Sequence, residues 1–173
     1  LMDEQGSVCC YCERSISSSP SHIEHIKPQS VYPDDRFNYS NLLSSCNGDG
    51  EKHCGHKKGN WFDPSLFVSP LDPDCVSYFK FTSAGEIKPT DDPHSRPAAQ
   101  ETIDHLNLND PSLVDKRKKV IDGLGITDSS FSNSELITIR NHYGHRDSSG
   151  RFSQFRACID YILGVHISSP SHP

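Results

Sequence analysis

The chain has 173 residues with a formal charge of −6 and an apolar content of 33%, and its mean hydropathy is −0.62. This length suffices for one ordinary domain, or for a small catalytic module with a helical extension, and the low apolar content predicts a small core that a bound metal would help to stabilise. The acidic charge excludes a uniformly basic nucleic-acid-binding surface, because phosphate binding relies on clustered Lys and Arg.

A loop-rich metal-binding module is predicted over residues 1–63. This segment is rich in Cys, His, Asn, Ser and Gly and has little helical periodicity. Residues 22–28 alternate in the manner of a short strand, which would place Glu24 and His25 on opposite faces.

A Pro-rich segment with a β-hairpin follows over residues 64–93. Its prolines forbid long helices. Residues 76–82 and 86–88 have strand character and flank the turn sequence Ser83-Ala84-Gly85, which predicts the hairpin.

A helical extension is predicted over residues 94–167, and a disordered tail over residues 168–173. Asp110 and Pro111 form a cap and first-turn pair that opens a helix running to Gly123. Three further helices are indicated by apolar sets, which are Ile103, Leu106 and Leu108, then Leu136, Ile137 and Ile139, and finally Phe152, Phe155, Ile159, Ile162 and Leu163.

No segment is predicted to enter a membrane, because no run approaches the roughly 20 apolar residues of a membrane span. Residues 1–7 show no signal-peptide pattern either, so we expect a cytoplasmic protein. The start at Leu1 in place of methionine leads us to expect a chain trimmed from a longer one.

Four cysteines predict a structural zinc site. Seven cysteines without an export signal favour metal ligation over disulfides. Cys9 and Cys12 form a Cys-x-x-Cys step, whose two thiolates can reach one tetrahedral ion at about 2.3 Å. Cys46 and Cys54 flank a glycine-rich insert that can fold back to present both sulfurs. Together they supply the four ligands of a closed site.

Alternatives to this ligand set remain open. Seven residues separate Cys46 from Cys54 instead of the usual two, so His53 could replace Cys54, and Cys10 could replace Cys9. The thiols could also be ordinary buried cysteines that act as small apolar residues.

Glu24 and His25 are candidate catalytic residues. A carboxylate can hold a hard divalent cation, and a neutral imidazole can take a proton from water. Taken alone, the pair is weak, because exposed Glu-His dipeptides are common. Asn41 alone fits a turn residue, and His56 alone fits a loop histidine or a zinc ligand.

Three motifs occur together with the Cys-x-x-Cys step. They are His-Ile-Glu-His-Ile-Lys-Pro at residues 22–28, Asn-Leu-Leu-Ser-Ser-Cys at residues 41–46, and Cys-Gly-His-Lys-Lys-Gly at residues 54–59. This combination resembles zinc-binding HNH endonucleases, and within them the PtuB nuclease subunits of Septu-type and retron-linked antiphage systems. The resemblance is strong from Cys9 to about Asp63 and weaker to about Arg117.

The resemblance implies an α+β fold with a zinc-stapled ββα-metal (HNH) core, the β-hairpin and the helical C-terminal part. His25 would be the general base, Glu24 and His56 would hold a catalytic Mg²⁺ or Mn²⁺, and Asn41 would orient His25. A helix beginning within residues 47–56 would carry His56 toward the strands. The sequence departs from the commonest pattern in having Glu at position 24 and in placing His56 two residues after Cys54.

Five other polar residues lie in or near these motifs. Lys27, Lys57 and Lys58 are candidate phosphate-binding residues, although they fit solvated lysines equally well. His22 is expected at the surface, and His53 remains open between ligand and surface residue.

The resemblance further implies an ABC or SMC-like ATPase partner of the PtuA type, with a reverse transcriptase and its DNA product in retron-linked systems. Residues from Arg96 onward would suit docking to such a partner, or would simply form the helical core. The expected function is hydrolysis of phosphodiester bonds in nucleic acid, with DNA preferred and tRNA as the second substrate. The rival interpretation is a non-catalytic zinc-binding module that binds a partner or nucleic acid.

Overall fold

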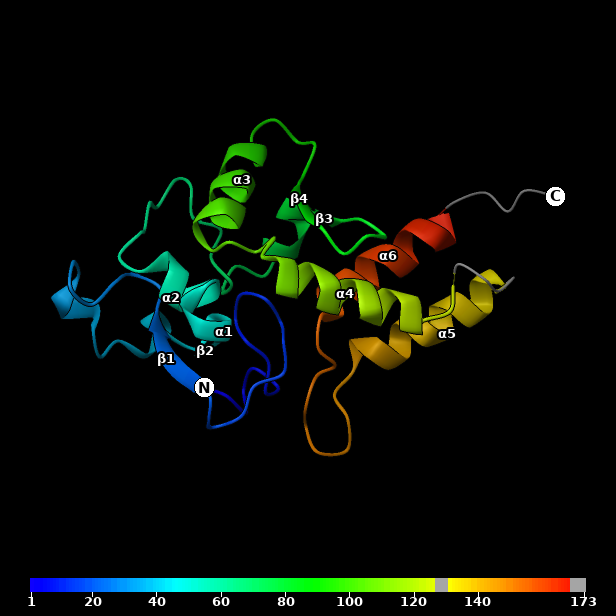
Figure 1. The fold of residues 1–173 in the computed structure, drawn as a ribbon, viewed down its shortest axis with the longest axis horizontal. Helices are drawn as coiled ribbons and strands as arrows, with labels where there is room; N and C mark the ends of the chain where they lie inside the picture. The colour runs from blue at the N-terminus through cyan, green and yellow to red at the C-terminus, as the bar shows by residue number, and fades with distance from the viewer. Residues whose placement is uncertain (127–130, 169–173) are drawn as a thin grey trace.

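The computed structural model of the chain describes residues 1–126 and 131–168. It contains two small antiparallel sheets and a set of helices, which confirms the mixed character expected from the sequence. The β1–β2 sheet with the short helices α1 and α2 lies at one end of the molecule, and the helices α5 and α6 lie at the other (Figure 1).

The first sheet consists of β1 (Ser21–His25) and β2 (Leu42–Cys46), which pair antiparallel. The predicted strand is therefore present, although it ends at His25. The strand β1 buries its charged side chain and exposes its apolar one, because Glu24 is 6% exposed while Ile23 is 60% exposed. A strand that buries a carboxylate and exposes an isoleucine faces a polar site and not an apolar core.

Two short helices follow β2 directly, α1 (Gly48–Glu51) and α2 (Cys54–Lys58). The connection between β1 and β2 contains two 3₁₀ turns, at Pro33–Asp35 and Tyr39–Asn41. A strand pair followed by a helix that carries His56 is the order expected from the motifs.

The predicted hairpin is present as β3 (Phe79–Phe81) and β4 (Ile87–Pro89). Its first strand is shorter than expected, because residues Cys75–Tyr78 form a 3₁₀ helix. The turn packs closely on α4: a side chain at Gly85 would place its Cβ 2.3 Å from the carbonyl oxygen of Val114.

The C-terminal part contains α3 (Arg96–His105), α4 (Pro111–Gly123), α5 (Asn133–Gly144) and α6 (Arg156–Ser168). The predicted cap of α4 is confirmed, because the Asp110 side chain accepts a hydrogen bond from the backbone N–H of Ser112. The helix α5 packs against α6.

The fourth apolar set only partly enters a helix. Phe152 and Phe155 precede α6, and Phe155 is nevertheless 1% exposed. Ser168, which we expected to open the tail, is the last residue of α6, while residues 169–173 lie outside the described part of the chain.

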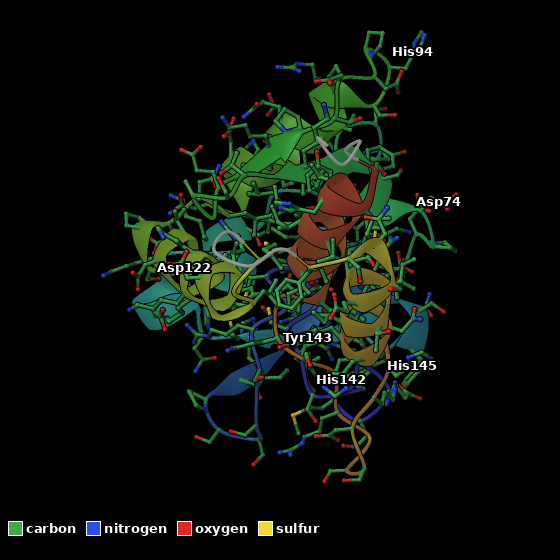
Figure 2. All side chains as sticks on the ribbon, turned by 90° about the vertical axis from the view of Figure 1, so that its right-hand side faces the viewer. Asp74, His94, Asp122, His142, Tyr143 and His145 are labelled. Atoms are coloured by element: carbon green, nitrogen blue, oxygen red, sulfur yellow. The ribbon has the colours of Figure 1, made fainter. Side chains whose placement is uncertain are left out.

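The main core joins both ends of the chain. It combines the four predicted zinc ligands with apolar side chains from all of the larger helices, including Leu106, Leu113, Leu136 and Leu163. Polar and charged side chains cover the outer surface, for example at Asp122, His142 and His145 (Figure 2). Among the described residues, none of the helices combines the length and the apolar character needed to cross a membrane.

Candidate metal centres

The four predicted cysteines come together in one buried cluster. The sulfur atoms of Cys9, Cys12, Cys46 and Cys54 all lie within 4.8 Å of one another. The Cys12 and Cys46 sulfurs are 3.8 Å apart, which is about the separation of two thiolates bound at about 2.3 Å to one tetrahedral ion. All four thiols are free and buried. This donor set fits a structural zinc ion.

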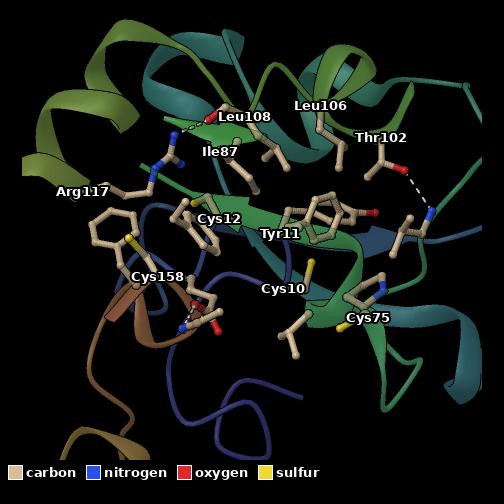
Figure 3. A pocket seen from close by; sticks show the side chains of 18 residues that line it. Cys10, Tyr11, Cys12, Cys75, Ile87, Thr102, Leu106, Leu108, Arg117 and Cys158 are labelled. Atoms are coloured by element: carbon tan, nitrogen blue, oxygen red, sulfur yellow. Dashed lines mark hydrogen bonds between the residues drawn. The ribbon is translucent and has the colours of Figure 1, made fainter. Parts of the chain in front are cut away.

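The alternative ligands lie outside the cluster. Cys10 lines an apolar pocket together with Tyr11 and Cys75 (Figure 3). His53 is fully buried, but its Nδ1 lies 3.0 Å from the Cys54 sulfur and thus contacts a ligand atom. We therefore assign His53 as a partner of the Cys54 thiolate and not as a replacement for it.

The insert between Cys46 and Cys54 folds back as the sequence suggested. Gly48, Asp49 and Gly50 all have positive φ, and a Cβ at Gly48 would lie 2.2 Å from the His53 carbonyl oxygen. This tight return delivers Cys54 to the cluster.

The charge of the thiols is consistent with metal binding. Hydrogen bonds from Cys12 and Cys54 lower the pKa of the Cys46 thiol to about 5. By contrast, burial raises the pKa of Cys10 well above its ordinary value. The cluster therefore favours a thiolate at Cys46, and thiolate is the form that binds zinc.

Glu24 is the centre of a second polar cluster, beside the first. Its Oε1 accepts hydrogen bonds from Lys58 Nζ at 2.8 Å and from the Tyr11 hydroxyl at 3.0 Å. Its Oε2 lies 3.3 Å from Nε2 of His22. Burial raises the pKa of Glu24, but His22, Lys58 and Tyr11 outweigh this effect and lower it below the ordinary value. Glu24 is thus a buried, ionised carboxylate.

Gly55 allows these atoms to pack directly against α2. A Cβ at this position would lie 2.2 Å from Glu24 Oε2 and 2.7 Å from His22 Nε2. Neither distance is sterically possible, so a larger residue at position 55 would displace the two side chains. Glu24 Oε2 and His22 Nε2 therefore meet in a narrow cradle between β1 and α2, with the backbone of Gly55 as its floor.

His56 lies at the outer side of this cradle. Its ring is tilted against the His22 ring, with 4.2 Å between centroids, and its Nδ1 is 3.8 Å from Glu51 Oε1. In the part of the chain that the structure describes, the four cysteines are the only set of at least three potential ligands gathered within 4.8 Å. An ion held by both Glu24 and His56 therefore requires the His56 side chain to turn.

His25 projects to the opposite face of β1, as the alternation predicted. Its Nε2 lies 3.1 Å from the carbonyl oxygen of Arg36. Asn41 is 4% exposed. It accepts a hydrogen bond from Lys27 N at 2.7 Å and donates to the carbonyl oxygens of Lys27 and Asp35. Asn41 thus closes the loop that carries the Arg36 carbonyl.

The predicted phosphate-binding lysines differ in placement. Lys58 is 3% exposed and bound to Glu24 and to the His25 carbonyl. An ammonium group in this position cannot reach a phosphate, so the expectation for Lys58 is corrected. Lys27 pairs with Asp35 at 2.9 Å while remaining partly exposed, and Lys57 is exposed.

His22 was missed as a site residue. The sequence placed it at the surface, but it contacts both Glu24 and Asn47, and its ring lies against that of His56. The signal for it was the period-two alternation of β1, which puts His22 and Glu24 on one face.

Comparison with known proteins supports the class indicated by the motifs. No family model matches the chain. The chain is nevertheless similar to HNH endonucleases and to PtuB, which confirms the resemblance predicted from its three motifs.

Two relatives carry this similarity. The first is "Retron Vc95 putative HNH endonuclease" from Vibrio cholerae serotype O1 biovar El Tor, 39% identical over 127 residues, which are 69% of this chain and 60% of the relative. The second is "Septu protein PtuB" from Bacillus thuringiensis, 34% identical over 61 residues, which are 34% of this chain and 22% of the relative. The matched region spans less than two thirds of either relative.

Proposed function

We propose that the chain is a metal-dependent HNH endonuclease that hydrolyses phosphodiester bonds in nucleic acid, with DNA preferred over tRNA. The observation that carries the proposal is the contact between His25 Nε2 and the Arg36 carbonyl oxygen. A carbonyl oxygen only accepts hydrogen bonds, so it selects the tautomer with the proton on Nε2. Nδ1 then carries a lone pair and serves as the general base toward a water molecule.

Asn41 acts as a positioning residue for this base. Its amide holds both Lys27 and Asp35, which bracket the loop that ends at Arg36. Loss of the amide would free the Arg36 carbonyl and with it the orientation of His25. Asn41 therefore contributes to catalysis without touching the substrate.

Glu24 and His56 are the proposed ligands of a catalytic Mg²⁺ or Mn²⁺. The donor set fits, since Glu24 Oε2 lies in the cradle beside Gly55 with an imidazole nitrogen, His22 Nε2, as its neighbour. Such an ion, when bound, stabilises the negative charge that develops on the scissile phosphate. Lys58 holds the other carboxylate oxygen and keeps Glu24 ionised and fixed. The zinc ion proposed for the four cysteines is structural, because all four positions of a tetrahedral ion are then filled.

The proposed biological setting is an antiphage defence complex in which this chain is the effector subunit. The names of its relatives support this setting. The partner would be an ABC or SMC-like ATPase of the PtuA type, with a reverse transcriptase and its DNA product in a retron-linked system. A net charge of −6 fits a subunit whose nucleic-acid contacts are partly supplied by a partner.

The test compares wild type, His25→Ala and the matched control His142→Ala, because His142 is exposed on the far helix α5. Plasmid DNA and total tRNA are incubated with each zinc-loaded protein, alone and with the PtuA-type ATPase proposed as its partner, in the presence of Mg²⁺ or Mn²⁺. We expect cleavage by wild type and His142→Ala and a loss of at least about 100-fold in His25→Ala, the scale of one general base.

Two results would contradict the proposal. If His25→Ala cuts as fast as wild type, His25 is not the base. If wild type leaves both substrates intact under every condition, the non-catalytic zinc module is the better interpretation.

A further inference from the structure

We propose that His22 is a direct ligand of the catalytic divalent ion and the closest partner of Glu24 in binding it. The inference rests on the proposed function for the identity of the ion. It adds a residue outside the Glu24 and His56 pair that the motifs indicated.

The distance between the two side chains suits a shared ion. His22 Nε2 and Glu24 Oε2 lie 3.3 Å apart. Two atoms that each bind one cation at about 2.1 Å, at an angle of about 90–110°, lie about 3.0–3.4 Å from each other. Both atoms lie in the cradle that has Gly55 as its floor.

Asn47 orients the His22 ring for this role. Its Oδ1 lies 3.2 Å from His22 Nδ1. An amide oxygen only accepts, so this contact favours a ring proton on Nδ1 and points Nε2 at Glu24. A divalent ion bound between Nε2 and Oε2 would replace the proton that links these two atoms. A histidine whose second nitrogen donates to a fixed oxygen is the usual form of a metal ligand.

The surrounding charges keep the second carboxylate oxygen available. Lys58 and Tyr11 both bind Glu24 Oε1, so Oε2 has His22 as its hydrogen-bonding neighbour. The His22 ring is 24% exposed and lies against the His56 ring, which places the cradle at the surface where a substrate phosphate can approach. His56 would complete the ligand set after turning toward the ion.

The zinc site stabilises the same geometry. Asn47 directly follows the zinc-site residue Cys46, and Gly55 directly follows Cys54. The orienting group and the open cradle are thus each one residue away from the cysteine cluster. This arrangement gives His22 a fixed position before any divalent ion binds.

The test measures Mn²⁺ binding to zinc-loaded protein by isothermal titration calorimetry and by pulsed electron paramagnetic resonance, which detects ¹⁴N nuclei of imidazole ligands. Mn²⁺ does not displace zinc from thiolates, because soft sulfur ligands favour zinc while Mn²⁺ suits oxygen ligands such as carboxylates. The variants are His22→Ala, Glu24→Gln as the positive control, and His142→Ala as the matched control on α5. Zinc content and circular dichroism report whether each variant is folded, and His22→Gln replaces His22→Ala if the latter loses zinc.

We expect Mn²⁺ affinity to fall at least about tenfold in His22→Ala and in Glu24→Gln, with no change in His142→Ala. The ¹⁴N signal should weaken in His22→Ala. Asn47→Ala should also weaken Mn²⁺ binding, by a smaller factor, while zinc content stays constant.

The inference is overturned if Mn²⁺ binds folded His22→Ala with wild-type affinity and ¹⁴N signal, or if wild type binds no Mn²⁺ at millimolar concentration. Its failure is distinguishable from failure of the proposed function. Cleavage that depends on His25 together with unchanged Mn²⁺ binding in His22→Ala would remove the inference alone. Mn²⁺ binding that depends on His22 in a protein that cuts neither DNA nor tRNA would remove the nuclease proposal alone.

Discussion

The N-terminal module and the helical part stabilise themselves in opposite ways. Within residues 1–63, the cysteine cluster, the ionised Glu24 and Lys58 are all buried. Residues 94–126 and 131–168 bury mostly aliphatic side chains such as Leu113 and Leu163. A chain with a small apolar fraction can therefore hold one polar region in a fixed geometry through a metal cluster and ion pairs. Most of the buried aliphatic side chains lie in the helical part, where no chemistry is proposed.

The two regions are nonetheless joined at defined points. The backbone N–H of Cys54 donates to the Leu106 carbonyl oxygen at 2.8 Å. Arg117, 3% exposed on α4, donates to the carbonyl oxygens of Gly85 and Leu108. Burial lowers the pKa of Arg117, and the nearby thiols of Cys158, Cys12 and Cys54 oppose this effect.

The largest expected effect is removal of the cysteine cluster. Cys46→Ser, or chelation of zinc, should unfold the N-terminal module, because structural zinc sites contribute on the order of 10 kcal/mol to small domains. Zinc content by atomic emission and urea unfolding followed by circular dichroism measure the effect. The matched control is Cys75→Ser, a partly buried thiol outside the cluster, for which zinc content should be unchanged. Full retention of structure in zinc-free Cys46→Ser would show that the N-terminal module does not depend on a metal for its stability.

The second effect belongs to the helical part. Leu163 is fully buried in α6, and Leu163→Ala should lower the free energy of unfolding by about 2–5 kcal/mol through the cavity it leaves. Zinc content should stay at the wild-type level in the folded variant. Ile137→Ala is the control, since Ile137 is 46% exposed on α5, and should change stability by less than about 1 kcal/mol. Equal losses for both variants would argue against a well-packed helical core.

The smallest effect concerns an ionic contact between the two regions. Asp49 contacts Arg14 at 2.6 Å and Lys116 of α4 at 2.7 Å. Asp49→Asn should lower stability by about 1 kcal/mol, and less at high salt, because the pairs are partly exposed. Arg14 and Lys116 hold the pKa of Asp49 well below its ordinary value.

The pH dependence of this contact follows from that lowered pKa. The contribution is fully present above the unfolded pKa near 4 and is lost as the pH falls toward the folded pKa. The difference between wild type and Asp49→Asn, measured by urea unfolding, should therefore be the same at pH 6 and pH 8. The control is Asp115→Asn on α4, the helix that carries Lys116. A difference that grows between pH 6 and pH 8 would contradict this assignment.

Sequence reasoning worked where the signal is local. The Cys-x-x-Cys step, the hairpin around Gly85 and the Asp110 cap each depend on a few neighbouring residues, and each appears in the structure. Alternation in β1 likewise predicted that Glu24 and His25 face opposite sides.

The remainder depends on contacts between distant residues. The burial of Lys58 follows from the packing of α2 against β1, which brings together residues 34 positions apart. The contact of His22 with Asn47 likewise spans 25 positions. No local pattern distinguishes a lysine that binds phosphate from one that neutralises a buried carboxylate. The roles of His22, His53 and Lys58 therefore required coordinates.

Gly55 limits which substitutions related sequences can accept. A methyl group at this position would collide with both Glu24 and His22, so evolution cannot change it independently of those two residues. A homologue with a larger residue at the equivalent of position 55 should have replaced His22, Glu24 or both, and would have given up the divalent-ion site that we propose for these residues. The residue at this position should therefore distinguish homologues that keep the proposed site from those that have lost it.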